Sequence, residues 1–217
     1  MSSVATAVEA IKTGEIEKLQ NLIAAEPTLS SARDENGVSL VMLSCYYRRP
    51  DAAEALLIAN RPLDIWEAAA LGSEEVIRQL CRQQPELIHA WSPDGFQPLH
   101  LAAFFGQPTA VQALLNLKAD VNAAAHNPMS VRPIHSAVAG RNHDVVRLLI
   151  EYGADLNVKQ HGGWTPLHAA AMHGDEALVN LFLDHGADRD LKSDDGQTAA
   201  DLAASKGQAA LAQKLNM

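Results

Sequence analysis

The sequence has few aromatic residues and only two cysteines, and each shortage limits what the chain can be. Aromatic residues make up 5% of the 217 residues, and the hydrophobic 47% is mostly alanine and leucine, a composition that favours helices. Cys45 and Cys81 are too few for a disulfide framework or a cysteine-rich metal site, so we expect both to be buried, reduced thiols. The cytoplasm is therefore the expected location.

Positive charge and long apolar runs are also lacking. A net charge of −9 disfavours a protein that binds nucleic acid through its phosphate backbone, which needs a basic face. No apolar run approaches the roughly 20 residues of a membrane span, and the first residues do not form a secretory signal. We therefore expect neither nucleic acid nor a membrane as partner.

A unit that recurs along the chain is clearest at residues 163–174. Its Pro-Leu-His segment at 166–168 has counterparts at 133–135, 98–100 and, more weakly, 199–201, at steps of roughly 33 residues. A second motif, similar to Gly-Ala-Asp, recurs in phase at 118–120, 153–155 and 186–188. Thr-Pro supplies a helix N-cap and first turn, and Gly follows a helix C-terminus, so each unit predicts a helix, a turn, a second helix and an extended loop.

The segment Thr165–Ala170 resembles the Thr-Pro-Leu-His-x-Ala signature of the ankyrin repeat family. The resemblance is plain over roughly residues 90–216. It implies an all-α repeat solenoid, a stack of helix-turn-helix units joined by short β-hairpin-like finger loops. It further implies a concave face, made of the fingers and first helices, on which partners bind.

The N-terminal third carries more divergent copies of the unit. We divide the chain into seven repeats, approximately residues 3–36, 37–62, 63–94, 95–129, 130–162, 163–195 and 196–217, within a single domain of residues 1–217. The first and last repeats carry polar residues suited to capping a stack. The step from Met42 to Trp66 falls about ten residues short of a full period, so we expect one finger to be missing near residues 60–64, where the stack could bend.

No motif of a known catalytic or phosphate-binding site is present, and we predict no catalytic residue, no cofactor and no metal site. His100, His135 and His168 occupy one phase of successive repeats, roughly 8–10 Å apart on stacked helices, which is too far apart to share one ion. The family resemblance implies a structural His that bonds the neighbouring loop. An atypical enzyme or metal site in the groove, through His161, His168 and His173, remains the alternative.

Large apolar residues fall on positions that the resemblance places outward on the concave face. The chain has only three Trp, three Tyr and four Phe, and aromatic side chains anchor interfaces. The candidate partner-binding residues are Tyr46, Tyr47, Trp91, Phe96, Phe104, Phe105, Met129, Val131, Trp164, Met172 and His173. Packing between neighbouring repeats, or contact between copies of the chain, is the alternative interpretation of the same residues.

We therefore predict a non-catalytic, monomeric protein-interaction module, acting as an adaptor, scaffold or inhibitor, whose partner is a protein of unknown identity. The alternative is the enzyme or metal-binding protein described above. Stacks of this kind serve many roles, so the fold alone does not select the partner.

Overall fold

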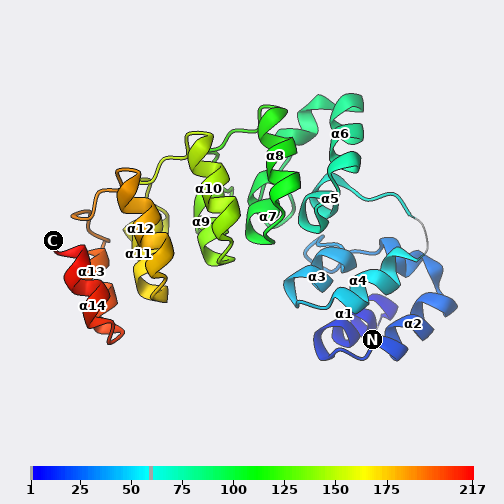
Figure 1. Ribbon diagram of the computed structural model, residues 1–217. Helices are drawn as coiled ribbons and strands as arrows, with labels where there is room; N and C mark the ends of the chain where they lie inside the picture. Colours follow the sequence, from blue (N-terminus) through cyan, green and yellow to red (C-terminus); the bar gives the residue numbers. More distant parts are fainter. Residues whose placement is uncertain (1, 59–60) are drawn as a thin grey trace.

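The computed structural model describes residues 2–58 and 61–217, and within them the helices form seven pairs (Figure 1). The pairs are α1 (Ser3–Thr13) with α2 (Ile16–Ala25), α3 (Leu40–Tyr46) with α4 (Pro50–Leu57), α5 (Ile65–Leu71) with α6 (Glu74–Gln83), α7 (Pro98–Phe104) with α8 (Pro108–Asn116), α9 (Pro133–Ala139) with α10 (His143–Glu151), α11 (Pro166–His173) with α12 (Glu176–Asp184), and α13 (Ala199–Ser205) with α14 (Ala209–Leu215). Short 3₁₀ helices lie at η1 (Pro27–Ser31), η2 (Pro85–His89) and η3 (His161–Gly163). The all-α repeat solenoid is confirmed.

The helix boundaries follow the capping signals in the sequence. In α11, the Thr165 side chain accepts a hydrogen bond from the His168 backbone N–H, and Pro166 occupies the first turn, where its missing N–H costs nothing. Gly153 and Gly186 follow the second helices α10 and α12 with φ of 85° and 84°, a conformation that glycine adopts without strain. The predicted helix-turn-helix unit is thus confirmed in its details.

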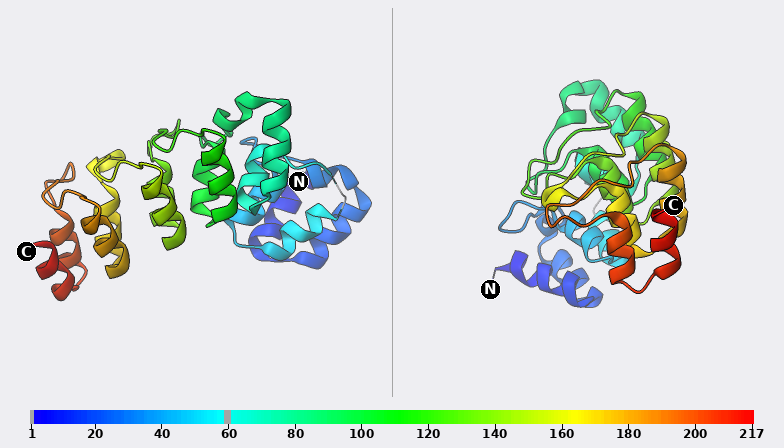
Figure 2. Two further views of the ribbon diagram at one scale, coloured as in Figure 1. Left: turned by 45° about the horizontal axis from the view of Figure 1, so that its top comes forward. Right: turned by 90° about the vertical axis from the view of Figure 1, so that its left-hand side faces the viewer.

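The helices pack in two rows. The first helices α5, α7, α9, α11 and α13 contact one another in sequence, and the second helices α6, α8 and α10 form a parallel row behind them. Alanines at the contact points, such as Ala102, Ala137 and Ala170, are fully buried and let neighbouring helices approach closely. The loops between repeats extend together to one side of the helices (Figure 2, right).

Each of five finger loops is closed by a backbone hydrogen bond of the same kind. The backbone N–H of Asp34, Ser92, Ala125, Gln160 and Ser193 donates, in that order, to the carbonyl of Val38, Phe96, Val131, Trp164 and Gln197, at 2.8–2.9 Å. Across the described residues this pairing forms no β-strand, only an isolated bridge between Arg33 and Ser39. The later fingers also bond to one another, for example from the His161 N–H to the Met129 carbonyl at 3.0 Å.

The first four helices are set at an angle to the rest of the stack. In Figure 1 the helices α5 to α14 follow one another in a gently curved row, whereas α1 to α4 lie below α5 with their axes turned. The apolar core is divided at the same place. Ile11, Leu19 and Leu56 belong to a core formed by residues 7–56, and a larger core runs from Met42 and α5 to Leu215.

The missing finger accounts for this bend. Residues 61–64 lead into α5 without a hairpin, as predicted, while Asn60, the first residue of the predicted segment 60–64, lies outside the described residues. The N-caps Ser39 and Asp64 show that Glu67, not Trp66, stands at the position of Met42. Glu67 is fully buried and pairs with Arg61 at 2.6 Å, and Asp64 pairs with Arg33 at 2.7 Å. Ion pairs thus occupy the place of the lost finger.

Candidate functional site

Two of the three aligned histidines, His100 and His168, bond to the finger loops and have both ring nitrogens engaged. In His100 the Nδ1 atom accepts the Gln97 backbone N–H at 3.3 Å, so Nε2 carries the proton and donates to the carbonyls of Ala123 and Val131 at 3.1 and 3.2 Å. His168 repeats the arrangement, with Nε2 3.1 Å from the Gln197 carbonyl. The structural role implied by the family resemblance is confirmed for both.

Burial controls the protonation state of these histidines. It lowers the pKa of His100 and of His135 to about 4, and it lowers the pKa of His168 as well. Each ring is therefore neutral at pH 7. His135 makes the same Nδ1 contact, with the Arg132 N–H at 3.1 Å, but its buried Nε2 has no hydrogen-bond partner within the described part of the chain.

The three histidines of the alternative metal site, His161, His168 and His173, are not arranged as metal ligands in the described residues. Both ring nitrogens of His168 are engaged with the protein, and His161 is exposed on η3 while His173 ends α11. In residues 2–58 and 61–217, no three His, Cys, Asp or Glu side chains lie close enough together to hold a metal ion. Both thiols are free, and Cys81 is buried as expected, whereas Cys45 is only half-buried, contrary to the expectation. Desolvation still raises the pKa of Cys45 to about 11.

An apolar hollow of about 240 Å³ lies on the face formed by the first helices and the fingers. Five predicted residues line it together: Tyr46 from α3, Phe96 and Phe104 at the two ends of the α7 segment, and Met129 and Val131 from the next finger. Phe104 and Met129 are 37% and 48% exposed, although both are large and apolar. This hollow, called the apolar hollow below, is the strongest candidate site.

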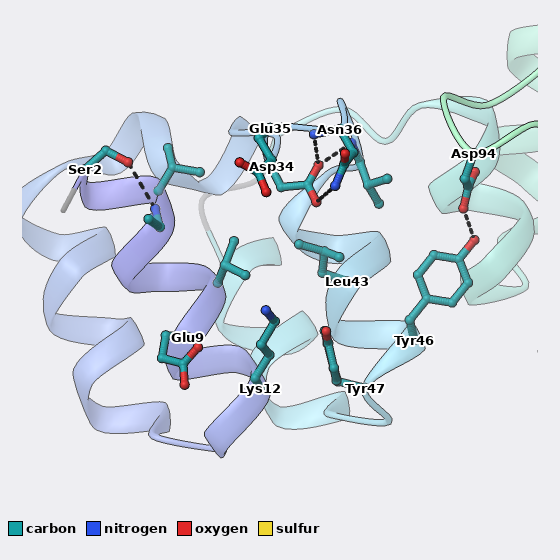
Figure 3. Close-up of a pocket in the computed structure, with 14 residues that line it drawn as sticks. Ser2, Glu9, Lys12, Asp34, Glu35, Asn36, Leu43, Tyr46, Tyr47 and Asp94 are labelled. Carbon is teal, nitrogen blue, oxygen red and sulfur yellow. Dashed lines mark hydrogen bonds between the residues drawn. The ribbon is translucent and has the colours of Figure 1, made fainter.

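Tyr46 separates the apolar hollow from a second, wider one. Its hydroxyl donates a hydrogen bond of 2.6 Å to the Asp94 carboxylate, across the gap left by the missing finger (Figure 3). Its ring packs against the ring of Phe105, with the ring centres 5.4 Å apart. Burial is the main cause that raises the pKa of Tyr46, and the hydrogen bond to Asp94 is the second. The hydroxyl therefore stays protonated. Beyond Tyr46 the second hollow, of about 970 Å³, is lined by α1, the first finger and α3.

The remaining predicted residues lie outside the apolar hollow. Tyr47 lines the second hollow, and Trp91 is stacked on His126 with ring centres 3.6 Å apart. Phe105 is half-buried behind Tyr46, and its ring contacts the ring of Phe104 edge to face, with the ring centres 5.1 Å apart. Trp164, Met172 and His173 are half-buried and belong to the repeat of α11, farther along the stack. The structure thus joins five of the predicted residues in one hollow and separates the others from it.

Sequence reasoning missed several lining residues. Leu101 and Ser136 lie one helical turn before Phe104 and Ala139 and share their face, so i, i+3 spacing could have revealed them. Gln160 closes the hollow from the following finger. Of the second hollow only Tyr46 and Tyr47 were predicted, and its acidic residues Asp34, Glu35 and Asp94 were not, although they stand on finger loops.

Comparisons with known proteins agree with this geometry. The family model for ankyrin repeats (3 copies) matches residues 65–160 and 134–216, which together make up more than two thirds of the chain. No helix of the described residues is long and apolar enough to cross a membrane. Ankyrin repeats are generally protein–protein interaction modules and typically non-catalytic.

The individual relatives are much longer proteins. The chain is 29% identical over 106 residues to ankyrin repeat and SAM domain-containing protein 6 of Rattus norvegicus, covering 49% of this chain and 12% of that protein. It is 28% identical over 157 residues to neurogenic locus notch homolog protein 1 of Homo sapiens, covering 68% of this chain and 6% of that protein. It is 29% identical over 117 residues to human BCL-6 corepressor-like protein 1, covering 54% of this chain and 6% of that protein. The repeat signature, the helix pairs and the family match together show that the chain belongs to the ankyrin repeat family.

Proposed function

We propose that the protein is a non-catalytic interaction module, an adaptor, scaffold or inhibitor, that binds another protein through its concave face and finger loops. The observation that supports this most strongly is the apolar hollow, where Phe104 and Met129 stay exposed beside Phe96 and Val131. An apolar surface of this kind on a folded chain commonly marks a partner site, because its burial is favourable.

The same proposal includes a single, monomeric domain in the cytoplasm. Contact between α3 and α5 links the two cores, and neighbouring repeats depend on such interfaces for stability. The free thiols Cys45 and Cys81 suit a reducing compartment.

Affinity capture with matched variants tests the binding site. The full chain, the Phe104→Ala variant and the Tyr152→Ala variant are each used to capture proteins from native lysate, followed by mass spectrometry. Tyr152 is a suitable control because it is 40% exposed but lies at the end of α10, in the row of second helices.

We expect Phe104→Ala to lose the captured partner while its melting temperature stays within a few degrees of the parent, because Phe104 is already partly in water. Tyr152→Ala should keep the partner. If Phe104→Ala captures the same proteins as the parent, the apolar hollow is not the binding site. Phe105 is left unchanged, because it packs behind Tyr46 and its removal would disturb the fold.

A further inference from the structure

Two hollows that differ in charge meet at Tyr46. Tyr46 lines both of them, and its hydrogen bond to Asp94 forms the partition between them. A segment of a partner that crosses this partition would therefore meet a surface without charged side chains on one side and a mixed surface that carries carboxylates on the other. The nature of each side indicates what kind of segment fits.

The apolar hollow suits a single large side chain. None of the described residues that line it is Asp, Glu, Lys or Arg. Its volume of about 240 Å³ lies below the roughly 300–1,000 Å³ of sites that enclose a whole drug-sized molecule. Phe96, Phe104 and Met129 offer aromatic and thioether contacts that adapt to an aliphatic or aromatic group.

The second hollow is acidic. Glu9, Asp34, Glu35 and Asp94 line it, and Lys12 is the one basic residue among its described lining residues (Figure 3). We call it the acidic hollow. Its charge is also in keeping with the net charge of −9 of the whole chain.

Two of these carboxylates are already committed to the fold, and two are not. Asp34 accepts the backbone N–H groups of Asn36 and Val38, both at 2.9 Å, and Asp94 binds Tyr46. The side chains of Glu9 and Glu35 are exposed, and in the described part of the chain neither has a hydrogen bond or an ion pair. They are free to bind a cation from a partner.

Lys12 offsets only part of the negative charge of the acidic hollow, because four carboxylates line it. Its Nζ atom lies 5.9 Å from the centre of the Tyr47 ring, and within residues 2–58 and 61–217 it forms no ion pair. Tyr47 is 43% exposed, so its ring also offers a face on which a second cation could be placed.

We propose that the groove recognises a short peptide segment that carries a Lys or Arg within a few residues of a large apolar side chain. The apolar side chain fills the apolar hollow, and the cation enters the acidic hollow between Glu9, Glu35 and Tyr47. The inference rests on the proposed function and specifies its partner. An acidic segment would meet repulsion at the acidic hollow, and an uncharged one would form no ion pair there.

Selection from a phage-displayed library of random 12-residue peptides, with the full chain as bait, tests this directly. We expect the enriched peptides to share a basic residue close to Leu, Met, Phe or Trp. Synthetic copies should bind more weakly as the salt concentration rises, because exposed charges are screened.

Two variants then separate the two hollows. Glu9→Gln combined with Glu35→Gln should weaken peptide binding about 5-fold or more, since each exposed ion pair contributes modestly. Phe104→Ala should weaken it at least about 10-fold. The matched control, Glu17→Gln with Glu75→Gln, removes the same charge from exposed positions outside both hollows and should change affinity less than about 2-fold.

The outcomes distinguish this inference from the proposed function. Peptides that require Phe104 but show no preference for basic residues, or that ignore the loss of Glu9 and Glu35, overturn the inference and leave the proposed function standing. Peptides that bind the Phe104→Ala variant as well as the parent overturn both. If no peptide is enriched, the inference fails, and the lysate capture decides the proposed function separately.

Discussion

Residues 61–217 and residues 2–58 are built from the same helix pair but stabilise their loops in different ways. In the C-terminal region, buried histidines such as His100 and His168 bond to the finger that follows them. Residues 1–60 contain no histidine, and the family model begins matching only at residue 65. Between the two regions, charged pairs stand where a finger is missing.

The difference teaches what the histidine is for. Repeat 2 is not followed by a finger within the described residues, and its equivalent position is Met42. Fingers also follow the repeats of α1 and α5, where the equivalent positions are Ala5 and Glu67, so a finger can form without a histidine. In their own repeats, His100 and His168 thus connect the N-terminus of their helix to the finger that follows.

The junction between the regions gives the largest expected effect. Glu67→Ala removes the partner of Arg61, whose side chain is only 12% exposed, and leaves a largely buried cation. We expect a loss of about 3–5 kcal/mol in the free energy of unfolding, measured by urea denaturation. Replacing both residues, Arg61→Met with Glu67→Leu, should restore most of the stability, because no charge is then buried alone. A double variant as unstable as Glu67→Ala would contradict this explanation.

Core substitutions measure how far the two regions depend on each other. Leu149→Ala, in the C-terminal core, should cost about 2–5 kcal/mol because Leu149 is fully buried, whereas exposed Arg147→Ala in the same helix should cost little. All three tryptophans lie beyond residue 61, but Trp66 adjoins the N-terminal region, so a Trp66→Phe background leaves Trp91 and Trp164 to report the C-terminal region.

The matching change in the other core is Leu56→Ala. If the chain unfolds as the single domain that we propose, Leu56→Ala also lowers the tryptophan midpoint, through the contact between α3 and α5. A midpoint that stays at the parent value would mean that the two regions unfold separately.

Acid should weaken the C-terminal region selectively. The folded-state pKa of His100 and of His135 is about 4, below the unfolded value of 6.5, so the stability they contribute is present above pH 6.5 and lost as the pH falls towards 4. At pH 5 the loss should be on the order of 2 kcal/mol for each of the two histidines. The urea midpoints at pH 7 and pH 5 measure this loss of stability. Between these two pH values, the midpoint of His100→Gln should fall less than that of the parent. An equal drop would assign the pH dependence to other groups.

The sequence predicted most of the fold because the signals are local. Thr165, Pro166 and His168 each have a fixed place in a repeat, and the short step after Met42 reveals the missing finger. The same alignment placed Phe96, Phe104, Met129 and Val131 on one face, and these do meet.

The rest of the site depends on how repeats are placed relative to one another. Tyr46 reaches Asp94 only because a finger is missing between them and the stack bends there. Phe104 and Phe105 are adjacent in sequence, yet one lines the apolar hollow and the other packs behind it. Neither fact follows from the spacing of one repeat, and this is why the acidic hollow was missed.

Photo-crosslinking provides the most direct test of the central claim that the partner sits in the apolar hollow. A photoreactive residue is introduced at Met129, which is 48% exposed at the edge of this hollow, and separately at Tyr152, which is 40% exposed on the row of second helices. The account predicts crosslinks to the partner from position 129 and none from position 152. Crosslinks from position 152 alone, or equally from both, would contradict it.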